Sequence, residues 1–214
     1  MTFGVIFDMD GVLIDSEEFY FERRLNYLAS QGVQPNSQEI QDFVGQTEQV
    51  IWERLITKDM QLRKKLYEGY RDYQQEHPID YSQVLKLDVR EVIQKLKENK
   101  YSLAIASSSK RREIFRMLSA TDLLPFFDFV ISGHELVHSK PHPEIYQRAF
   151  TELSCESAVA VEDSNTGIQS AKAAGLYTFA VKQSFDVDQK QADQLISSLS
   201  ELPTWLNKVF EERY

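Results

Sequence analysis

Two patterns of hydrophobic positions divide the chain. One consists of short apolar runs without alternation between apolar and polar residues, which are typical of parallel strands buried on both faces. The other consists of apolar residues at helical spacing. Because the two patterns alternate from residue 82 onward, they predict a parallel sheet covered by helices. The predicted strands are 3–8, 101–106, 127–131, 158–163 and 177–181.

Residues 15–81 carry only the helical pattern, with no convincing strand. This stretch interrupts the alternation directly after the first strand. We therefore predict an α/β fold with a Rossmann-like, doubly wound core built from residues 1–14 and 82–214 and an inserted helical cap at 15–81. An insert that leaves at the end of the first strand is expected to lie near the carboxyl edge of the sheet, where such folds bind their ligands.

Composition narrows the function classes. The chain has 214 residues, of which 42% are hydrophobic and 12% aromatic, so it can bury a substantial core. A net charge of −9 argues against a nucleic-acid-binding surface. No apolar run approaches the length of a membrane span, and the N-terminus reads directly as a strand rather than a signal peptide. With Cys155 as the single cysteine, no internal disulfide can form, which fits a reducing, cytoplasmic setting. Taken with the charge and the apolar runs, we expect a monomer that binds neither nucleic acid nor membranes.

Polar residues stand at the carboxyl ends of the predicted strands. Asp8 ends the first strand, Ser107 ends the second, and Glu162 and Asp163 end the fourth. Lys140 follows the third strand after a short connection. Because the carboxyl ends of parallel strands meet at one edge of a sheet, we expect these side chains to lie close together. Clustered carboxylate and carbonyl oxygens suit Mg²⁺.

Asp8 and Asp10 place two acids one residue apart. In an extended chain their side chains would point the same way, but Gly11 indicates a turn, so Asp10 is expected to offer its carbonyl to the metal. A bound cation would relieve the repulsion between neighbouring carboxylates. One carboxylate could then attack phosphorus while the other protonates the leaving oxygen and later deprotonates water.

Four motifs surround these residues: "DMDGVLIDSE" at 8–17, "LAIASSS" at 103–109, "SKPHPEIY" at 139–146 and "AVAVEDSNTGIQSAKAAG" at 158–175. Each is weak alone, but all four in this order are specific. In these motifs the chain resembles the haloacid dehalogenase-like phosphatase superfamily. It looks most like the helical-cap group that includes β-phosphoglucomutases and phosphoglycolate phosphatases, and the resemblance spans nearly the whole chain.

The resemblance implies a phosphoric monoester hydrolase that turns over a small phosphorylated metabolite. Asp8 would be the nucleophile that becomes an aspartyl phosphate, and Asp10 would be the general acid and base. Members that cleave carbon–halogen bonds lack this second aspartate, so its presence favours phosphoryl transfer. Glu162 is expected to bind the metal directly or through water. The implied metal ligands are Asp8, Asp10, Glu162 and Asp163, and the implied phosphate-binding residues are Ser107, Ser108 and Lys140.

A sugar phosphomutase is the first alternative. β-Phosphoglucomutases carry a histidine in the first cap helix and an arginine just after a glycine resembling Gly45. This chain has Tyr20 and Glu48 at those places, and an acid there would repel a second phosphate. We therefore expect a phosphatase rather than a mutase. The cap residues expected to contact substrate are Tyr20, Gln46, Thr47 and Glu48.

Other interpretations carry less weight. A non-catalytic binding protein on this fold would be expected to lack one of the four key residues Asp8, Asp10, Lys140 and Asp163, and all are present. "HELVH" at 134–138 satisfies the zinc-peptidase pattern H-E-x-x-H, which needs a sustained helix. Flanking Gly133 and Pro141 leave room for one or two turns, so we interpret the match as chance.

Two local features carry separate expectations. One serine within 107–109 is expected to be the N-cap of the following helix. Leu87 and Asp88 stand where the family commonly has Pro-Gly. This departure from the family pattern bears on substrate recognition more than on catalysis.

Overall fold

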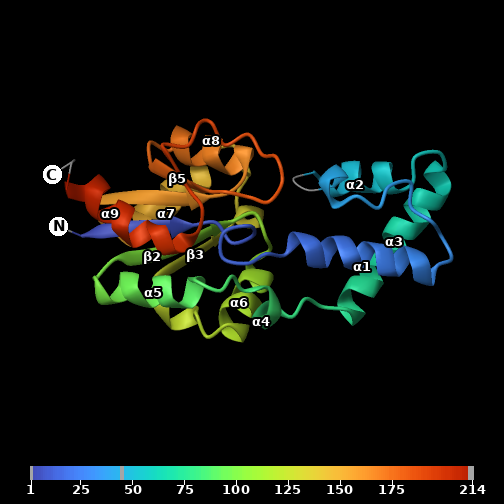
Figure 1. Cartoon of the computed structure of the whole chain (residues 1–214), viewed down its shortest axis with the longest axis horizontal. Coiled ribbons are helices and arrows are strands. Elements are labelled where there is room, and N and C mark those ends of the chain that lie inside the picture. The colour runs from blue at the N-terminus through green and yellow to red at the C-terminus, as the bar shows by residue number, and fades with distance from the viewer. Residues whose placement is uncertain (1, 44–45, 212–214) are drawn as a thin grey trace. The chain divides into compact units, whose positions relative to one another are not determined.

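The computed structural model describes residues 2–43 and 46–211. It forms two compact units, one of Met1–Asp15 with Tyr81–Tyr214 and one of Ser16–Asp80 (Figure 1). The first unit contains the sheet and the second contains helices. None of the helices in the described part of the chain combines the length and the apolar character needed to cross a membrane.

The sheet of the first unit has six strands in the order β3-β2-β1-β4-β5-β6, and every neighbouring pair is parallel. The five strands predicted from apolar runs are confirmed. The last strand was missed because its three residues, "QLI", carry no extended apolar run. The strands are β1 Phe3–Phe7, β2 Ser102–Ser107, β3 Phe129–Ser132, β4 Ser157–Glu162, β5 Tyr177–Val181 and β6 Gln194–Ile196.

Helices of the same unit cover the sheet on both sides, as Figure 1 shows. Helix α7 packs against β1, β2 and β3, while α8 packs against β4 and β5. Val89, Val92, Ile93 and Leu96 form a buried apolar face on α5. These observations confirm the Rossmann-like α/β fold. The helices are α4 Tyr81–Val84, α5 Val89–Glu98, α6 Arg111–Ala120, α7 Glu144–Leu153, α8 Asn165–Ala173 and α9 Leu202–Glu211.

The order of the strands places the carboxyl end of β1 at a topological switch point. Strands β2 and β3 extend the sheet on one side of β1, and β4, β5 and β6 extend it on the other. Phe7 at the end of β1 lies opposite Ile105 of β2 and Val161 of β4. The Asp8 amide continues this pairing by donating to the Val161 carbonyl at 2.9 Å. Open α/β sheets bind their ligands at such a crevice.

The helical unit has a core of its own. It contains α1 Glu17–Ser30, α2 Glu48–Leu55 and α3 Met60–Glu76, with a short 3₁₀ turn at Ile40–Asp42. Its interior combines aliphatic and aromatic side chains: Tyr27 and Tyr70 are buried with ring centroids 5.4 Å apart. Among residues 16–43 and 46–80, no strand occurs.

The two chain segments that connect to this unit are paired with each other inside the α/β unit. The Asp15 amide donates to the Val84 carbonyl at 2.7 Å, and the Lys86 amide donates to the Leu13 carbonyl at 3.1 Å. Ile14 and Leu85 form an antiparallel bridge between them. The segment that leaves β1 and the segment that returns to α5 are therefore held side by side.

Candidate active site

Asp8 and Asp10 lie on a tight turn that follows β1. The Gly11 amide donates to the Ile14 carbonyl at 2.8 Å, and Gly11 has a φ of 77°. A side chain at Gly11 would have its Cβ 2.0 Å from Oδ2 of Asp163. Glycine is needed here both for the backbone conformation and for the close approach of Asp163.

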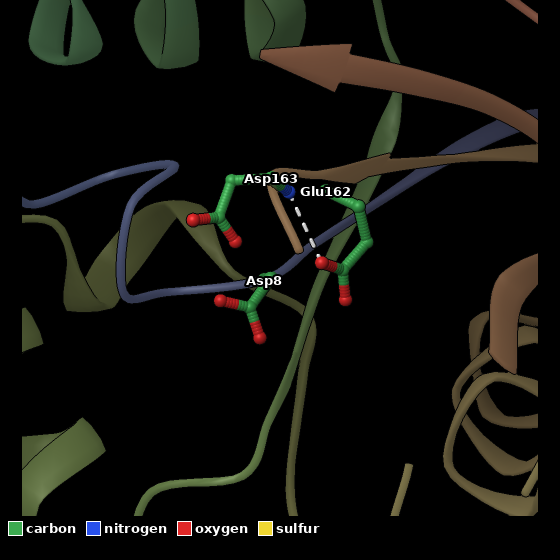
Figure 2. Close-up of side chains that lie close together, drawn as sticks. All are labelled: Asp8, Glu162 and Asp163. Atoms are coloured by element: carbon green, nitrogen blue, oxygen red, sulfur yellow. Dashed lines mark hydrogen bonds between the residues drawn. The ribbon is translucent and has the colours of Figure 1, made fainter. Parts of the chain in front are cut away.

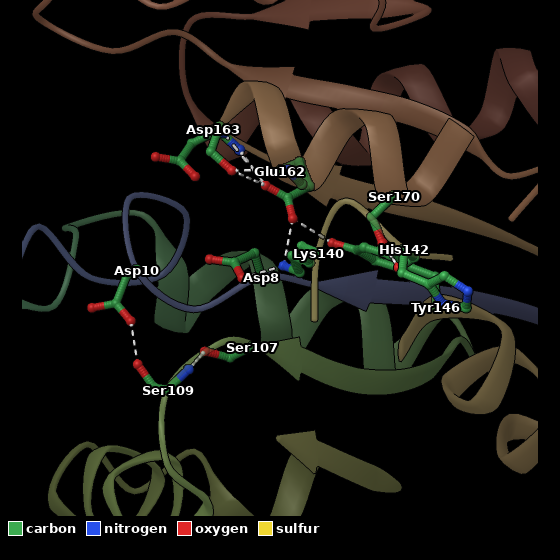
Figure 3. Close-up of polar contacts among 12 residues, drawn as sticks. Asp8, Asp10, Ser107, Ser109, Lys140, His142, Tyr146, Glu162, Asp163 and Ser170 are labelled. Carbon is green, nitrogen blue, oxygen red and sulfur yellow. Dashed lines mark hydrogen bonds and ion pairs between the residues drawn. The ribbon is translucent and has the colours of Figure 1, made fainter. Parts of the chain in front are cut away.

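Lys140 joins the ends of two strands. Its Nζ donates to Oδ1 of Asp8 at 2.6 Å and to Oε1 of Glu162 at 2.5 Å (Figure 3). All three side chains are nearly or fully buried, with exposed fractions of 5%, 10% and 0%. Such short bonds between opposite charges orient both carboxylates strongly. The structure thus brings together residues 132 positions apart in the sequence.

The buried charges perturb one another. Burial raises the pKa of Asp8 to about 7, and the Lys140 charge opposes that increase while Glu162 adds to it. Burial alone would lower the pKa of Lys140, but the charges of Asp8 and Glu162 and the hydrogen bonds to both carboxylates together outweigh burial and raise it. The pKa of Asp163 is raised well above its ordinary value by burial and then by Glu162 and Asp8. The site concentrates more negative charge than Lys140 offsets.

Glu162 is fully buried and held by several donors. Its Oε1 also accepts from the Tyr146 hydroxyl at 2.6 Å, and its Oε2 accepts from the Asp163 amide at 3.1 Å and the Ser164 hydroxyl at 3.2 Å. A Cβ at Gly167 would lie within 2.1 Å of this carboxylate, so glycine is required to admit it. Both oxygens of Glu162 are therefore committed to protein donors.

Asp8, Glu162 and Asp163 meet the requirements for a hard cation. One carboxylate oxygen from each lies within 4.8 Å of the others, and Figure 2 shows the three side chains converging from the ends of β1 and β4. Oxygen donors at this spacing suit Mg²⁺ or Ca²⁺. The Asp163 backbone is fixed as well, because Gln189 Nε2 donates to its carbonyl at 2.6 Å. The donor set fits a divalent cation.

The serine loop after β2 differs from the expectation. The N-cap residue of α6 is Lys110, and no side chain caps this helix, so the predicted serine cap is wrong. The buried Ser107 hydroxyl accepts from the Ser109 amide at 3.0 Å, and Ser108 is exposed. The Ser109 hydroxyl donates to Oδ2 of Asp10 at 2.7 Å. These bonds fold the loop back toward the acids (Figure 3).

Sequence reasoning assigned no site role to Ser109 and Tyr146. A signal for Tyr146 was available, because "SKPHPEIY" ends on an aromatic position at a fixed distance from the lysine. Lys140 Nζ lies 5.1 Å from the centre of the Tyr146 ring. No comparable signal singled out Ser109 among three consecutive serines, since only the folded loop shows which one faces Asp10.

The structure supplies no helix for the H-E-x-x-H pattern. Gly133–Glu135 is a 3₁₀ turn and Leu136 is extended. Glu135 accepts from Arg111 at 3.0 Å and from the Ser132 amide at 3.3 Å. His134 and His138 are therefore not presented together on one helical face, which agrees with a chance match.

The four cap candidates make contacts within the helical unit. The Arg23 guanidinium lies 5.2 Å from the centre of the Tyr20 ring. The Gln46 amide donates to the Phe43 carbonyl at 3.2 Å, and Thr47 caps α2 by accepting from the Val50 amide. These contacts account for the residues locally, and their contact with substrate stays a prediction.

The charge of Glu48 is offset in the structure, which corrects the expectation that this acid would repel a second phosphate. Glu48 forms an ion pair with the buried Arg24 and accepts from Trp52 Nε1 at 3.2 Å. It is therefore not the unbalanced acid that the sequence suggested, because Arg24 offsets its charge. Gly45, which marks the place of the mutase arginine, lies outside the described residues.

Comparisons with known proteins agree with this geometry. The sequence profile of the haloacid dehalogenase-like hydrolases matches residues 5–181. The chain is 31% identical over 177 residues to a phosphorylated carbohydrates phosphatase of Thermotoga maritima, covering 81% of this chain and 82% of the relative. It is 29% identical to hexitol phosphatase B of Escherichia coli, covering 93% of each protein.

A solved structure extends the similarity to the fold. A Thermotoga maritima protein for which a β-phosphoglucomutase activity has been proposed superposes with a TM-score of 0.78 at 30% identity, covering 98% of this chain and 100% of that one. The profile match covers all four motifs and the site that they form. This chain belongs to the haloacid dehalogenase-like hydrolase family.

Proposed function

We propose that the protein is a Mg²⁺-dependent phosphatase that hydrolyses a small phosphorylated metabolite through an aspartyl phosphate on Asp8. The observation that carries the proposal is the buried Asp8 carboxylate, held by Lys140 beside Glu162 and Asp163 at the switch point of the sheet. Relatives named as phosphatases of phosphorylated carbohydrates and hexitols support the substrate class.

Asp8 is the proposed nucleophile. A carboxylate oxygen forms a bond to phosphorus as the bond between phosphorus and the substrate oxygen breaks. The Lys140 ammonium, 2.6 Å from Oδ1 of Asp8, orients this carboxylate and offsets negative charge on the phosphoryl oxygens. Ser107 and the amide of Ser108 are the proposed further donors to those oxygens.

Asp10 is the proposed proton carrier. Its carboxyl group gives a proton to the leaving oxygen and afterwards takes one from the water that attacks the aspartyl phosphate. The second attack breaks the bond between phosphorus and Asp8, releases inorganic phosphate and restores the free carboxylate. The Ser109 hydroxyl, 2.7 Å from Oδ2 of Asp10, holds the side chain in place for both transfers.

Asp8, Asp163 and the Asp10 carbonyl are the proposed direct ligands of Mg²⁺. When bound, the ion would offset negative charge on the phosphoryl oxygens and on the acids around it. Because both oxygens of Glu162 already accept from protein donors, we assign Glu162 to orienting Lys140 and to a water-bridged contact with the ion.

The helical unit Ser16–Asp80 is the proposed cap and source of substrate selectivity, with Tyr20, Gln46, Thr47 and Glu48 as candidate contacts. A mutase is the second candidate function. A solved structure with a proposed β-phosphoglucomutase activity supports it, and the Arg24–Glu48 ion pair removes the argument that Glu48 would repel a second phosphate.

A screen of phosphorylated metabolites with Mg²⁺ tests the proposal. We expect release of inorganic phosphate from sugar or polyol monophosphates by the wild-type protein and none by Asp8→Asn. Turnover that requires priming by a sugar bisphosphate would support the mutase instead. Neither phosphate release nor primed isomerisation with any compound, aryl phosphates included, would contradict both.

A further inference from the structure

Lys86 lies on the segment that returns from the helical unit to α5. Its amide donates to the Leu13 carbonyl at 3.1 Å, and the adjacent Leu85 bridges to Ile14. The segment therefore runs beside the turn that carries Asp8 and Asp10. This location brings a residue 75 positions away in the sequence to Gly11.

The Lys86 side chain contacts the turn directly. Its Nζ donates to the Gly11 carbonyl, which also accepts from Gln183 Nε2 at 3.0 Å. One carbonyl of the glycine turn is thus held from two sides by residues outside the four motifs. The Lys86 side chain is partly buried, which restricts the positions open to its ammonium group.

The ammonium also lies within the field of several acids. Burial lowers the pKa of Lys86, while the charges of Asp15, Asp163 and Asp88 oppose that decrease. In return, the Lys86 charge counteracts the burial that raises the pKa of Asp163. Lys86 is therefore a second cation at the acidic edge, besides Lys140.

The residues after Lys86 keep it in place. Leu87 is fully exposed, whereas Asp88 Oδ2 accepts from the Ser200 amide at 2.9 Å. The segment is anchored at Leu13 on one side of Lys86 and at Ser200 on the other. Leu87 and Asp88, which replace the Pro-Gly common in the family, thus still give a fixed return path.

We propose that Lys86 is a positioning residue for the metal centre, fixing the Gly11 carbonyl and placing a positive charge beside Asp163 that weakens cation binding. The inference rests on the proposed function, because it assumes that Asp8 and Asp163 hold Mg²⁺. A positive charge near these carboxylates repels the ion. A neutral donor at this position would support the turn without this effect.

Mg²⁺ titration calorimetry at about pH 8 tests the proposal on three variants and the wild type. Lys86→Gln removes the charge but retains an N–H donor, and we expect it to bind Mg²⁺ roughly three- to tenfold more tightly. Lys86→Arg retains the charge and changes the geometry, so its affinity should stay within about twofold of wild type. Lys95→Gln is the control, because it makes the same charge change at an exposed position of α5.

The outcomes separate this inference from the proposed function. Mg²⁺ affinity that is unchanged or weaker in Lys86→Gln would overturn the role of the charge, as would weaker binding in Lys86→Arg. If Lys86→Gln does not fold, as judged by its thermal transition, Lys86→Met replaces it, and Mg²⁺ affinity that is unchanged or weaker in that variant would overturn the role of the charge. Wild-type protein that binds no Mg²⁺, with Asp163→Asn indistinguishable from it, would contradict the metal site itself.

Discussion

The acidic centre of the α/β unit and the polar residues of the helical unit use charge in different ways. In the α/β unit, Asp8, Lys140 and Glu162 come from three distant parts of the sequence and are held together in the interior. In the helical unit, Glu48 is paired with Arg24 from the neighbouring helix, and half of its side chain is exposed. The first arrangement concentrates buried charge at the proposed reaction site, whereas the second lies beside the aromatic side chains of the helical core.

The difference explains why sequence predicts one region better than the other. Residues at the ends of parallel strands converge wherever the strands pair, so motif positions translate into proximity. Residues on helices of an insert depend on how those helices pack, which no motif specifies. Substitutions in the α/β unit should therefore change the reaction chemistry, and those in the helical unit should change substrate preference more than chemistry.

Among substitutions that lower activity without abolishing it, the largest effect is expected for Asp10. Asp10→Asn should lower kcat/KM for a sugar phosphate by about 10²- to 10⁴-fold, because the leaving oxygen loses its proton donor when the aspartyl phosphate forms. The loss of kcat/KM should be much smaller with 4-nitrophenyl phosphate, whose leaving group needs no proton. Steady-state kinetics on both substrates measure the contrast. Equal losses on the two would argue that Asp10 is not the general acid, and Ser109→Ala should show the same contrast in weaker form.

Lys140 should matter for stability as well as activity. Lys140→Met removes the cation from two buried carboxylates, and we expect the free energy of unfolding to fall by about 3–5 kcal/mol. Lys172→Met is the matched control, because its ion pair with Asp193 is partly exposed and should contribute at most about 1 kcal/mol. Urea unfolding in the absence of metal measures both. Similar losses in the two variants would mean that the buried ion pairs of Lys140 contribute no more to stability than an exposed one.

Mg²⁺ and pH should act together on the acidic centre. Burial raises the pKa of Asp8 from an ordinary value of 3.8, which applies to the unfolded chain, to about 7 in the folded protein. In the metal-free protein, this group therefore lowers stability as pH rises between those values. Added Mg²⁺ should raise the melting temperature little at about pH 5 and markedly at about pH 8, because the ion binds deprotonated carboxylates. A shift independent of pH would contradict the site, and Asp163→Asn should abolish it.

The smallest effect is expected in the helical unit. Glu48→Gln should lower the free energy of unfolding by about 1 kcal/mol, since the pair with Arg24 is half exposed on the Glu48 side. It should leave kcat for 4-nitrophenyl phosphate within about threefold of wild type while changing the preference among sugar phosphates. Glu53→Gln, on the exposed face of α2, serves as control. A large loss of kcat on the aryl substrate would remove the distinction between the two regions.

Much of the fold and the centre of the site could be predicted from the sequence. The apolar runs identified β1 to β5, and the acids, serine and lysine that follow them lie at one edge of the sheet. The structure was needed for β6, which is too short to leave a pattern, and for Ser109 and Lys86, each of which makes a specific contact that depends on loop geometry. Tyr146 had a signal in the aromatic position that ends "SKPHPEIY", but its bond to Glu162 is visible only in the structure.

Trapping the aspartyl phosphate tests the central claim most directly. Wild-type protein mixed with substrate and Mg²⁺, quenched during turnover and reduced with borohydride, should carry homoserine in place of Asp8 in the peptide that contains residues 8–15. Peptide mass spectrometry identifies the site, and Asp8→Asn treated in the same way should show no reduced residue. Turnover without any modification at Asp8, or with modification at another residue, would contradict the account.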